Sequence, residues 1–398
     1  MNFGLTEWEK KFQQEVRDFI KENLTPDMVY DAGLQDTPER QAFISKIGEK
    51  GWLKIGFPKE YGGDGVDNPT AKYILNTELL RAGGPIVGKN LGQICGTLMM
   101  FGGEHLKQEF IARTLANEIQ WAIVYSEPGA GSDLAAMSCK AEIDGDDFII
   151  NGEKRWITSA HYGDYFWTAV RTDPKASKHK GISLIIIDHD APGITLQPTI
   201  MLGSDGGSNA GVHRTNSVFF DNVRVPRSRL IGEMNKGFNY MMHALNLERF
   251  LMFGVMNEWR HYEALLGWVK KQKGEDGKPL LEDPLVRHRL ARLDLAMEAA
   301  RALDLRCCAK AASDEGTTPA VEAFMTKVQF TIAYTELAQV AMDLIGPDAT
   351  IMLGDEVVLD GIAAAMYYQY GHQRIAAGGC DVAKNQIAKQ LFQLPPSF

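Results

Sequence analysis

The sequence predicts an α+β protein in which an antiparallel β domain stands between two α-helical domains. Its 398 residues allow two or three domains at roughly 150 residues each. Residues 1–117 and 233–398 repeat apolar side chains with the period of helices, whereas residues 118–232 form short runs separated by Asp-Gly, Pro-Gly and Gly-Gly pairs. We therefore expect an N-terminal helical domain (1–117), a β domain (118–232) and a C-terminal helical bundle (233–398).

The N-terminal region is predicted to be helical because its apolar residues recur on one helix face. The first helix has such residues at i, i+4, i+8, i+11 and i+12, namely Trp8, Phe12, Val16, Phe19 and Ile20. The glycine-rich segment 58–65 interrupts the pattern, and further helices are expected at 69–81 and 91–101.

The middle region changes to the composition of strands. We expect strands at 120–125, 139–143, 148–150, 166–171, 182–188 and 218–225. Because no long helix separates these runs, the strands are expected to pair antiparallel, with a hairpin at Asp144–Asp147. From residue 233 the chain is predicted to be helical, with breaks between long helices at Pro279, Pro284, Pro319 and Pro347.

Charge and cysteine content exclude several classes of protein. The formal net charge of −9 argues against a nucleic-acid binder, which needs a basic face. Five cysteines without metal-ligand spacing predict reduced packing residues, no metal site and a cytoplasmic location. We expect no signal peptide and no membrane span, because the first residues are charged and the longest aliphatic run is 182–187. The sequence also lacks the GxGxxG, GxxxxGK[ST], HExxH and GxSxG motifs.

Two segments of the middle region could bind a cofactor. In the segment 125–133, a small glycine-bearing turn follows a strand, so backbone N–H groups and the hydroxyls of Ser126 and Ser132 could approach an anion. In the segment 151–159, Trp156 and Thr158 are two residues apart on one strand face and could cover a flat heteroaromatic ring. A tight loop and an ordinary half-buried strand are the alternatives.

A third segment, 238–257, contains only two formally charged residues, Glu248 and Arg249, among many Met, Leu and Phe side chains. Burial raises the pKa of a carboxylate and an adjacent arginine offsets this, so Glu248 could be a general base near neutral pH. A structural Glu–Arg ion pair is the alternative.

Taken together and in this order, four segments make the chain resemble the acyl-CoA dehydrogenase family. They are SEPGAGSD at 126–133, GEKRWITS at 152–159, FDNVRVP at 220–226 and GFNYMMHALNLER at 237–249. The resemblance implies FAD as cofactor, removal of the α-proton of an acyl-CoA thioester by a Glu, and transfer of the β-hydrogen as hydride to the flavin N5. It also implies an electron-transferring flavoprotein as electron acceptor and a homo-oligomer, a tetramer or a dimer.

The resemblance also assigns residues. It implies that Tyr125, Ser126, Gly131 and Ser132 contact FAD, with Ser132 also near the CoA substrate, and that Trp156 and Thr158 flank the isoalloxazine. Many members carry their base in a C-terminal Tyr-Glu-Gly-Thr motif, where this chain has Gly378 beside the cofactor. A minority, of isovaleryl- and long-chain type, carry it in a Leu-Glu-Arg motif, which matches residues 247–249 and makes Glu248 the base next to Arg249 as a substrate-binding residue.

The chain departs from the family at the segments that reach a neighbouring subunit's FAD. Residues 270–277 replace the usual Arg-x-x-Phe-Gly, and residues 346–349 replace Gly-Gly-Asn-Gly. Rival interpretations are another flavin reaction on the same scaffold, such as that of a monooxygenase or a desulfinase, and a non-catalytic subunit of a heteromeric dehydrogenase.

Three glycines bear on the size of the acyl group that the chain could accept. Gly88, Gly92 and Gly96 recur at i, i+4 and i+8, which leaves one helix face without side chains. Glycine destabilises a helix interior by roughly 1 kcal/mol relative to alanine, so something must approach this face closely. Either another helix packs there, or Gly88 and Gly92 line a pocket for a bulky branched, alicyclic or aromatic acyl group.

Overall fold

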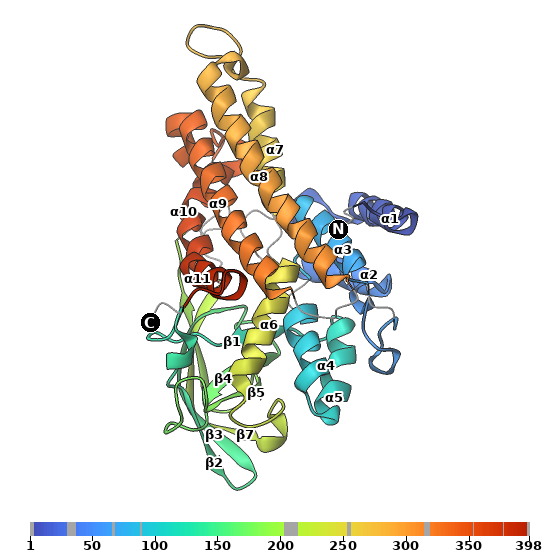
Figure 1. The fold of residues 1–398 in the computed structure, drawn as a ribbon, viewed down its shortest axis with the longest axis vertical. Helices are drawn as coiled ribbons and strands as arrows, with labels where there is room; N and C mark the ends of the chain where they lie inside the picture. The colour runs from blue at the N-terminus through green and yellow to red at the C-terminus, as the bar shows by residue number, and fades with distance from the viewer. Residues whose placement is uncertain are drawn as a thin grey trace.

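A computed structural model describes residues 4–29, 37–65, 68–87, 90–202, 214–252, 256–313, 319–352, 354–376 and 378–395. For residues 27, 247–252 and 257 it describes the backbone alone. The chain forms two helical parts and one β-sheet, with helix α6 (Gly237–Met252) between the sheet and the N-terminal helices (Figure 1). The C-terminal helices extend away from the sheet as an elongated bundle (Figure 1). This arrangement confirms the predicted α+β fold class.

The N-terminal part consists of short helices, and the side chains of Thr6, Thr37 and Asn68 cap the first three α-helices. They are α1 (Glu7–Asn23), α2 (Pro38–Glu49), α3 (Pro69–Arg81), a π-helix (Asn90–Gly96), α4 (Thr97–Phe101) and α5 (Glu104–Leu115). The Thr6 hydroxyl accepts a hydrogen bond from the Glu9 N–H, and the Glu9 carboxylate accepts one from the Thr6 N–H. Trp8 departs from the predicted apolar face, because it is exposed and stacks on the buried Phe12.

In the part of the chain that the structure describes, the sheet contains seven strands in the order β1-β4-β2-β3-β7-β6, and β5 pairs with β4. The strands are β1 (Trp121–Val124), β2 (Lys140–Asp144), β3 (Asp147–Thr158), β4 (Tyr165–Arg171), β5 (Ile182–Asp188), β6 (Ile194–Thr199) and β7 (Thr215–Pro226). The predicted hairpin joins β2 and β3, with Asp144 opposite Asp147.

Two details of the sheet differ from the sequence prediction. Strand β4 pairs parallel with β1 and, at Lys140 and Arg171, with β2, whereas the remaining pairs are antiparallel. The β2–β3 hairpin lies between β1 and β4 in the sequence, so the connection is long enough for a parallel crossover. Strand β6 escaped prediction because Pro198 interrupts its pattern, and proline is tolerated at an edge strand such as β6.

In the described residues of the C-terminal part, two long α-helices, α8 and α9, pack with three shorter ones. They are α7 (Met256–Val269), α8 (Pro284–Ala311), α9 (Ala320–Ile345), α10 (Ile362–Ile375) and α11 (Cys380–Leu391). Helices α7 to α10 share one buried apolar core. We propose residues 117 and 232 as the domain boundaries, because they fall in the connections between α5 and β1 and between β7 and α6.

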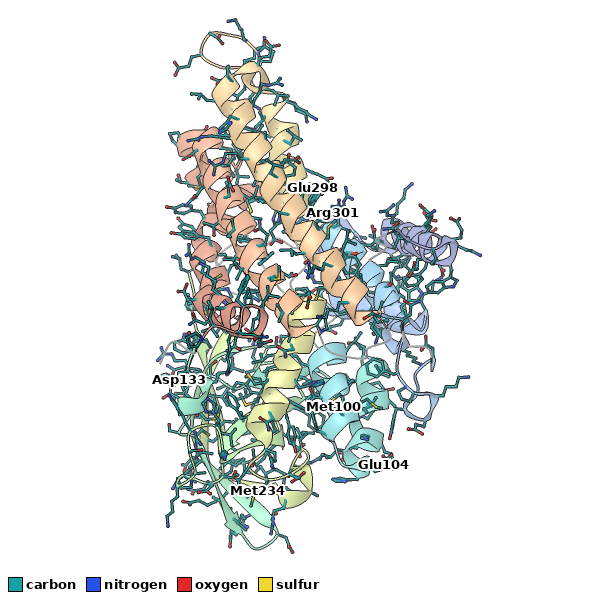
Figure 2. The ribbon with its side chains drawn as sticks, viewed as in Figure 1. Met100, Glu104, Asp133, Met234, Glu298 and Arg301 are labelled. Carbon is teal, nitrogen blue, oxygen red and sulfur yellow. The ribbon has the colours of Figure 1, made fainter. Side chains whose placement is uncertain are left out.

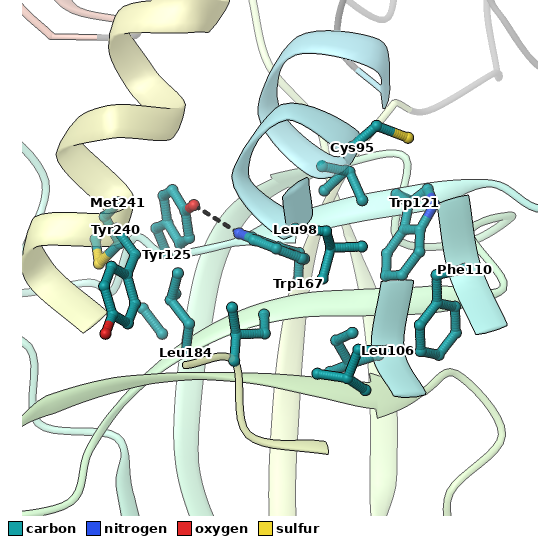
Figure 3. Close-up of a cluster of buried hydrophobic side chains, with 14 of the residues drawn as sticks. Cys95, Leu98, Leu106, Phe110, Trp121, Tyr125, Trp167, Leu184, Tyr240 and Met241 are labelled. Carbon is teal, nitrogen blue, oxygen red and sulfur yellow. Dashed lines mark hydrogen bonds between the residues drawn. The ribbon is translucent and has the colours of Figure 1, made fainter. Parts of the chain in front are cut away.

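A second apolar core joins the N-terminal helices to the sheet and to α6. Trp121 of β1 lies against Phe110 of α5, while Tyr240 and Met241 of α6 cover the other end of this cluster (Figure 3). The residues that follow β1 are thereby fixed relative to α6. Within the described ranges, every helix is too short or too polar to cross a lipid bilayer.

Candidate functional site

The segment 125–133 forms an open loop at the end of β1. Tyr125 is buried, and its hydroxyl accepts a hydrogen bond of 2.9 Å from Trp167 Nε1 (Figure 3). A side chain added at Gly129 or Gly131 would meet no atom within 4 Å. Tyr125 therefore anchors the loop in the core while its glycines face open space.

The two serines of this loop lie on its accessible side. Ser126 is half-buried and Ser132 is exposed, as is Gly131 between them. Asp133, at the end of the loop, lies at the end of the sheet nearest the C-terminal bundle (Figure 2). The loop can thus offer hydroxyl and backbone donors to an anionic group from outside.

Trp156 owes its orientation to a β-bulge. Lys154 pairs with Val218 of β7 but Ile157 pairs with Asn216, so two residues of β3 stand opposite one of β7. Trp156 has a φ of +60° within this bulge. In a regular strand Trp156 and Thr158 would share the face of the buried Lys154.

The bulge instead leaves both predicted flavin-flanking residues accessible. Trp156 is 45% exposed and Thr158 is exposed, whereas Ile157 between them is buried. Both side chains are accessible, which agrees with the predicted shared face. Their exposure results from the bulge, however, and not from the alternation of a regular strand. An exposed indole next to a hydroxyl suits a flat polar ring, which would cover the indole.

A buried ion pair connects the two segments, and the sequence interpretation missed it. Lys154 Nζ lies 2.8 Å from Glu127 Oε1 and donates to the Tyr125 carbonyl at 3.0 Å. Burial alone would raise the pKa of Glu127, but the Lys154 charge and the hydrogen bonds from Lys154, Ser138 and Cys139 lower it instead. The signal for this pair was an acidic residue in the first motif and a basic residue in the second.

Glu248 and Arg249 lie on α6, and their side chains are outside the described residues. Helix α6 packs against the π-helix and against β5. On the same helix, partial burial lowers the pKa of His243.

Gly378 stands in the connection between α10 and α11 with a φ of +90°. This is a left-handed conformation that residues with a Cβ adopt only under strain. A glutamate at this position, as in the Tyr-Glu-Gly-Thr motif, would be disfavoured in this backbone.

Of the three glycines predicted to share one α-helix face, Gly92 and Gly96 lie in a π-helix instead. Gly88 lies outside the described residues, whereas Gly92 is buried in the π-helix, which packs against α6. π-Helical segments are rare in proteins, and those that occur often lie at functional sites. A cavity of about 30 Å³ lies next to Asn90 and Leu91 of the same π-helix.

Comparisons with known proteins agree with this arrangement. Family models for the N-terminal, middle and C-terminal domains of acyl-CoA dehydrogenases match residues 6–118, 122–223 and 235–392. The chain belongs to the acyl-CoA dehydrogenase family. It is therefore an oxidoreductase, and FAD is its cofactor.

Two relatives from Mycobacterium tuberculosis illustrate the similarity. The chain is 31% identical to the acyl-CoA dehydrogenase FadE26 over 370 residues, 88% of each protein. It is 28% identical to the acyl-CoA dehydrogenase IpdE1 over 401 residues, 97% of this chain and 98% of IpdE1.

Two solved structures share the fold over nearly the whole chain. The Tcur3481–Tcur3483 steroid ACAD has a TM-score of 0.87 at 30% identity, with 100% of both chains covered. The ChsE4–ChsE5 complex from Mycobacterium tuberculosis has a TM-score of 0.87 at 28% identity, with 99% of this chain and 100% of the other covered.

The described residues fit a flavin. The loop 125–133 provides open glycines and hydroxyls for a charged group, and Trp156 and Thr158 provide an accessible aromatic face with a polar neighbour. Contacts of the individual residues with FAD stay predictions.

Proposed function

We propose that this acyl-CoA dehydrogenase converts an acyl-CoA thioester to its 2-enoyl-CoA with Glu248 as the base. The observation that carries the proposal is the position of the Leu-Glu-Arg segment 247–249 on α6, a helix packed against both the sheet and the π-helix. The positive φ of Gly378 supports the same choice, because the alternative position disfavours a glutamate.

The proposal assigns a role to each residue of the candidate site. FAD, when bound, supplies the acceptor for the hydride from the substrate β-carbon. Glu248 takes the α-proton, and Arg249 and Ser132 bind the thioester substrate. Ser126, Gly131 and Ser132 hold the cofactor with Tyr125 and Gly378, while Trp156 and Thr158 flank its ring and exclude water.

Anaerobic mixing with acyl-CoA thioesters tests the reaction directly. The flavin absorbance should bleach on mixing with substrate, and an artificial electron acceptor should then support turnover. A panel of straight, branched, alicyclic and aromatic acyl groups identifies the substrate class. In a monooxygenase or a desulfinase on this scaffold, an acyl-CoA would not bleach the flavin under anaerobic conditions.

We further propose that the acyl group is bulky, either branched or ring-bearing. Gly92 supports this, because it is a buried residue without a side chain in the π-helix, a segment that packs against α6. A structural relative named a steroid ACAD supports a ring-bearing class. Preference for straight chains in the panel would contradict the proposal.

Gly92→Leu distinguishes the pocket from simple helix packing. If Gly92 lines the pocket, the variant should fold, retain FAD and lose activity on bulky substrates while short ones still react, because leucine fills the space. Thermal unfolding, the flavin content and the substrate panel measure this. Gly267→Leu is the control, because a side chain at Gly267 of α7 meets no atom within 4 Å. Misfolding, or equal losses on all substrates, would favour helix packing.

Trp156→Ala tests the flavin contact. The variant should bind FAD about tenfold more weakly and change the flavin absorption band, because the ring loses an aromatic cover. Equilibrium dialysis of the apo-protein and visible spectra measure this. Trp8→Ala removes another exposed indole, 55% accessible on α1, and should change neither property. Unchanged affinity and spectrum for Trp156→Ala would rule out the contact.

We propose that the protein forms a homo-oligomer, a tetramer or a dimer, and passes electrons to an electron-transferring flavoprotein. Large apolar side chains are exposed on α10 and near the C-terminus, including Ile375 at 69% and Phe392 at 65%. Such a surface is typical of protein interfaces. The five cysteines are free and buried, which supports a cytoplasmic location.

A non-catalytic role in a heteromeric dehydrogenase is the second candidate, because one structural relative is described as a complex of ChsE4 with ChsE5. Purification of this chain alone decides between them. One FAD per chain and turnover without a partner would support the homo-oligomer, and absence of both would support the heteromer.

A further inference from the structure

The Glu127–Lys154 pair is buried where the two proposed flavin-binding segments meet. The side chain of Lys154 is 0% exposed and that of Glu127 is 4% exposed. Glu127 belongs to the loop 125–133 and Lys154 to strand β3, 27 positions further along the chain. The pair therefore joins two segments that are far apart in sequence.

Glu127 accepts four hydrogen bonds, and Lys154 donates two. Lys154 Nζ donates to Glu127 Oε1 at 2.8 Å and to the Tyr125 carbonyl at 3.0 Å. Glu127 Oε2 accepts from the N–H and hydroxyl of Ser138, and Oε1 accepts from the Cys139 N–H at 2.9 Å. The carboxylate thus connects the loop 125–133 to the residues directly before β2, and the lysine connects that loop to β3.

Such an arrangement is a poor way to gain stability alone. Removing two charges from water is unfavourable, and well-packed apolar residues often replace a buried ion pair without loss of stability. Apolar contacts are not directional, whereas hydrogen-bonded partners specify the distance and the angle between two segments.

The Glu127–Lys154 pair lies next to the bulge that carries Trp156, a proposed ring-binding residue. Lys154 immediately precedes the bulge that contains Arg155 and Trp156. The Arg155 N–H donates to the Ser126 carbonyl at 2.9 Å, which is a second connection between loop and strand. A change at Lys154 would consequently shift Trp156 relative to Ser126.

We propose that Glu127 and Lys154 are positioning residues, which hold the loop 125–133 and the Arg155–Trp156 bulge at the spacing that lets both contact one flavin. This inference rests on the proposed flavin site, since neither side chain is accessible to FAD itself. It requires that loss of the pair weakens FAD binding more than it weakens the fold.

The test compares Lys154→Met with Glu322→Gln in the full-length protein. Glu322 is also a buried carboxylate, 5% exposed, and pairs from the first turn of α9 with Arg306 and Lys310 of α8. FAD affinity of each apo-protein, thermal unfolding and hydrogen exchange at the Arg155 amide are measured. Should Lys154→Met fail to fold, Glu127→Gln/Lys154→Met takes its place, because it leaves no unpaired charge.

We expect Lys154→Met to bind FAD at least tenfold more weakly than Glu322→Gln, and its Arg155 amide to exchange at least tenfold faster than in the wild type. Losses of FAD affinity no larger than in Glu322→Gln, with an unchanged Arg155 amide, would overturn the inference. The exchange measurement needs no cofactor. A wild-type protein that binds no FAD would therefore contradict the proposed function, while the exchange rates would still decide whether the pair holds loop and strand together.

Discussion

Glu248→Gln is expected to retain FAD and to lose about a thousandfold of its rate of flavin reduction by an acyl-CoA, which equals about 4 kcal/mol of activation free energy. Glutamine preserves the size of the side chain but cannot accept the α-proton. A positioned general base contributes about a hundredfold to ten-thousandfold to a rate, so its loss should dominate all other effects of the change. Anaerobic stopped-flow absorbance measures the reduction of the flavin.

Two further measurements make this result specific. The Glu248→Gln protein should still bind the acyl-CoA, because the substitution removes basicity and little volume. Glu322→Gln makes the same chemical change at a buried carboxylate between α8 and α9 and should reduce its flavin at the wild-type rate. A Glu248→Gln protein with near-normal flavin reduction would show that the base lies elsewhere in the chain.

Local sequence patterns predicted the segments that make up the fold and the site. The helix expected at 69–81 is α3, and the strand expected at 182–188 is β5, residue for residue. In both cases the pattern and the caps act within a few residues, so no distant contact is needed to specify them. The segment expected as one helix at 91–101 instead divides into a π-helix and α4.

The features that escaped prediction depend on contacts between distant segments. The bulge at Arg155–Trp156 exists only in the pairing of β3 with β7, and the sequence of β3 alone still alternates. The parallel pairing of β1 with β4 depends on where the β2–β3 hairpin folds. The Glu127–Lys154 pair likewise needs both segments in place, although each charged residue was visible inside its motif.

The second large effect is expected on stability, at the core between α5 and the sheet. Trp121 is fully buried in β1 and contacts Phe110 of α5 and Trp167 of β4 with its ring. Its Nε1 donates to the Thr114 hydroxyl at 3.0 Å, and that hydroxyl donates to the Phe110 carbonyl. One side chain therefore joins the N-terminal helices to the strand that precedes the flavin-binding loop.

Trp121→Ala should lower the free energy of unfolding by about 4 kcal/mol, because the truncation removes buried apolar surface and leaves a cavity in a close-packed core. Trp121→Phe keeps a ring and loses the hydrogen bond to Thr114, so it should cost about 1 to 2 kcal/mol. Trp8→Ala, at a 55% exposed indole, should cost less than about 1 kcal/mol. Denaturant unfolding at saturating FAD compares the three, because unequal cofactor occupancy would otherwise shift the apparent stability. A loss for Trp121→Ala as small as that for Trp8→Ala would mean that the α5–sheet core is not what holds β1 against the helices.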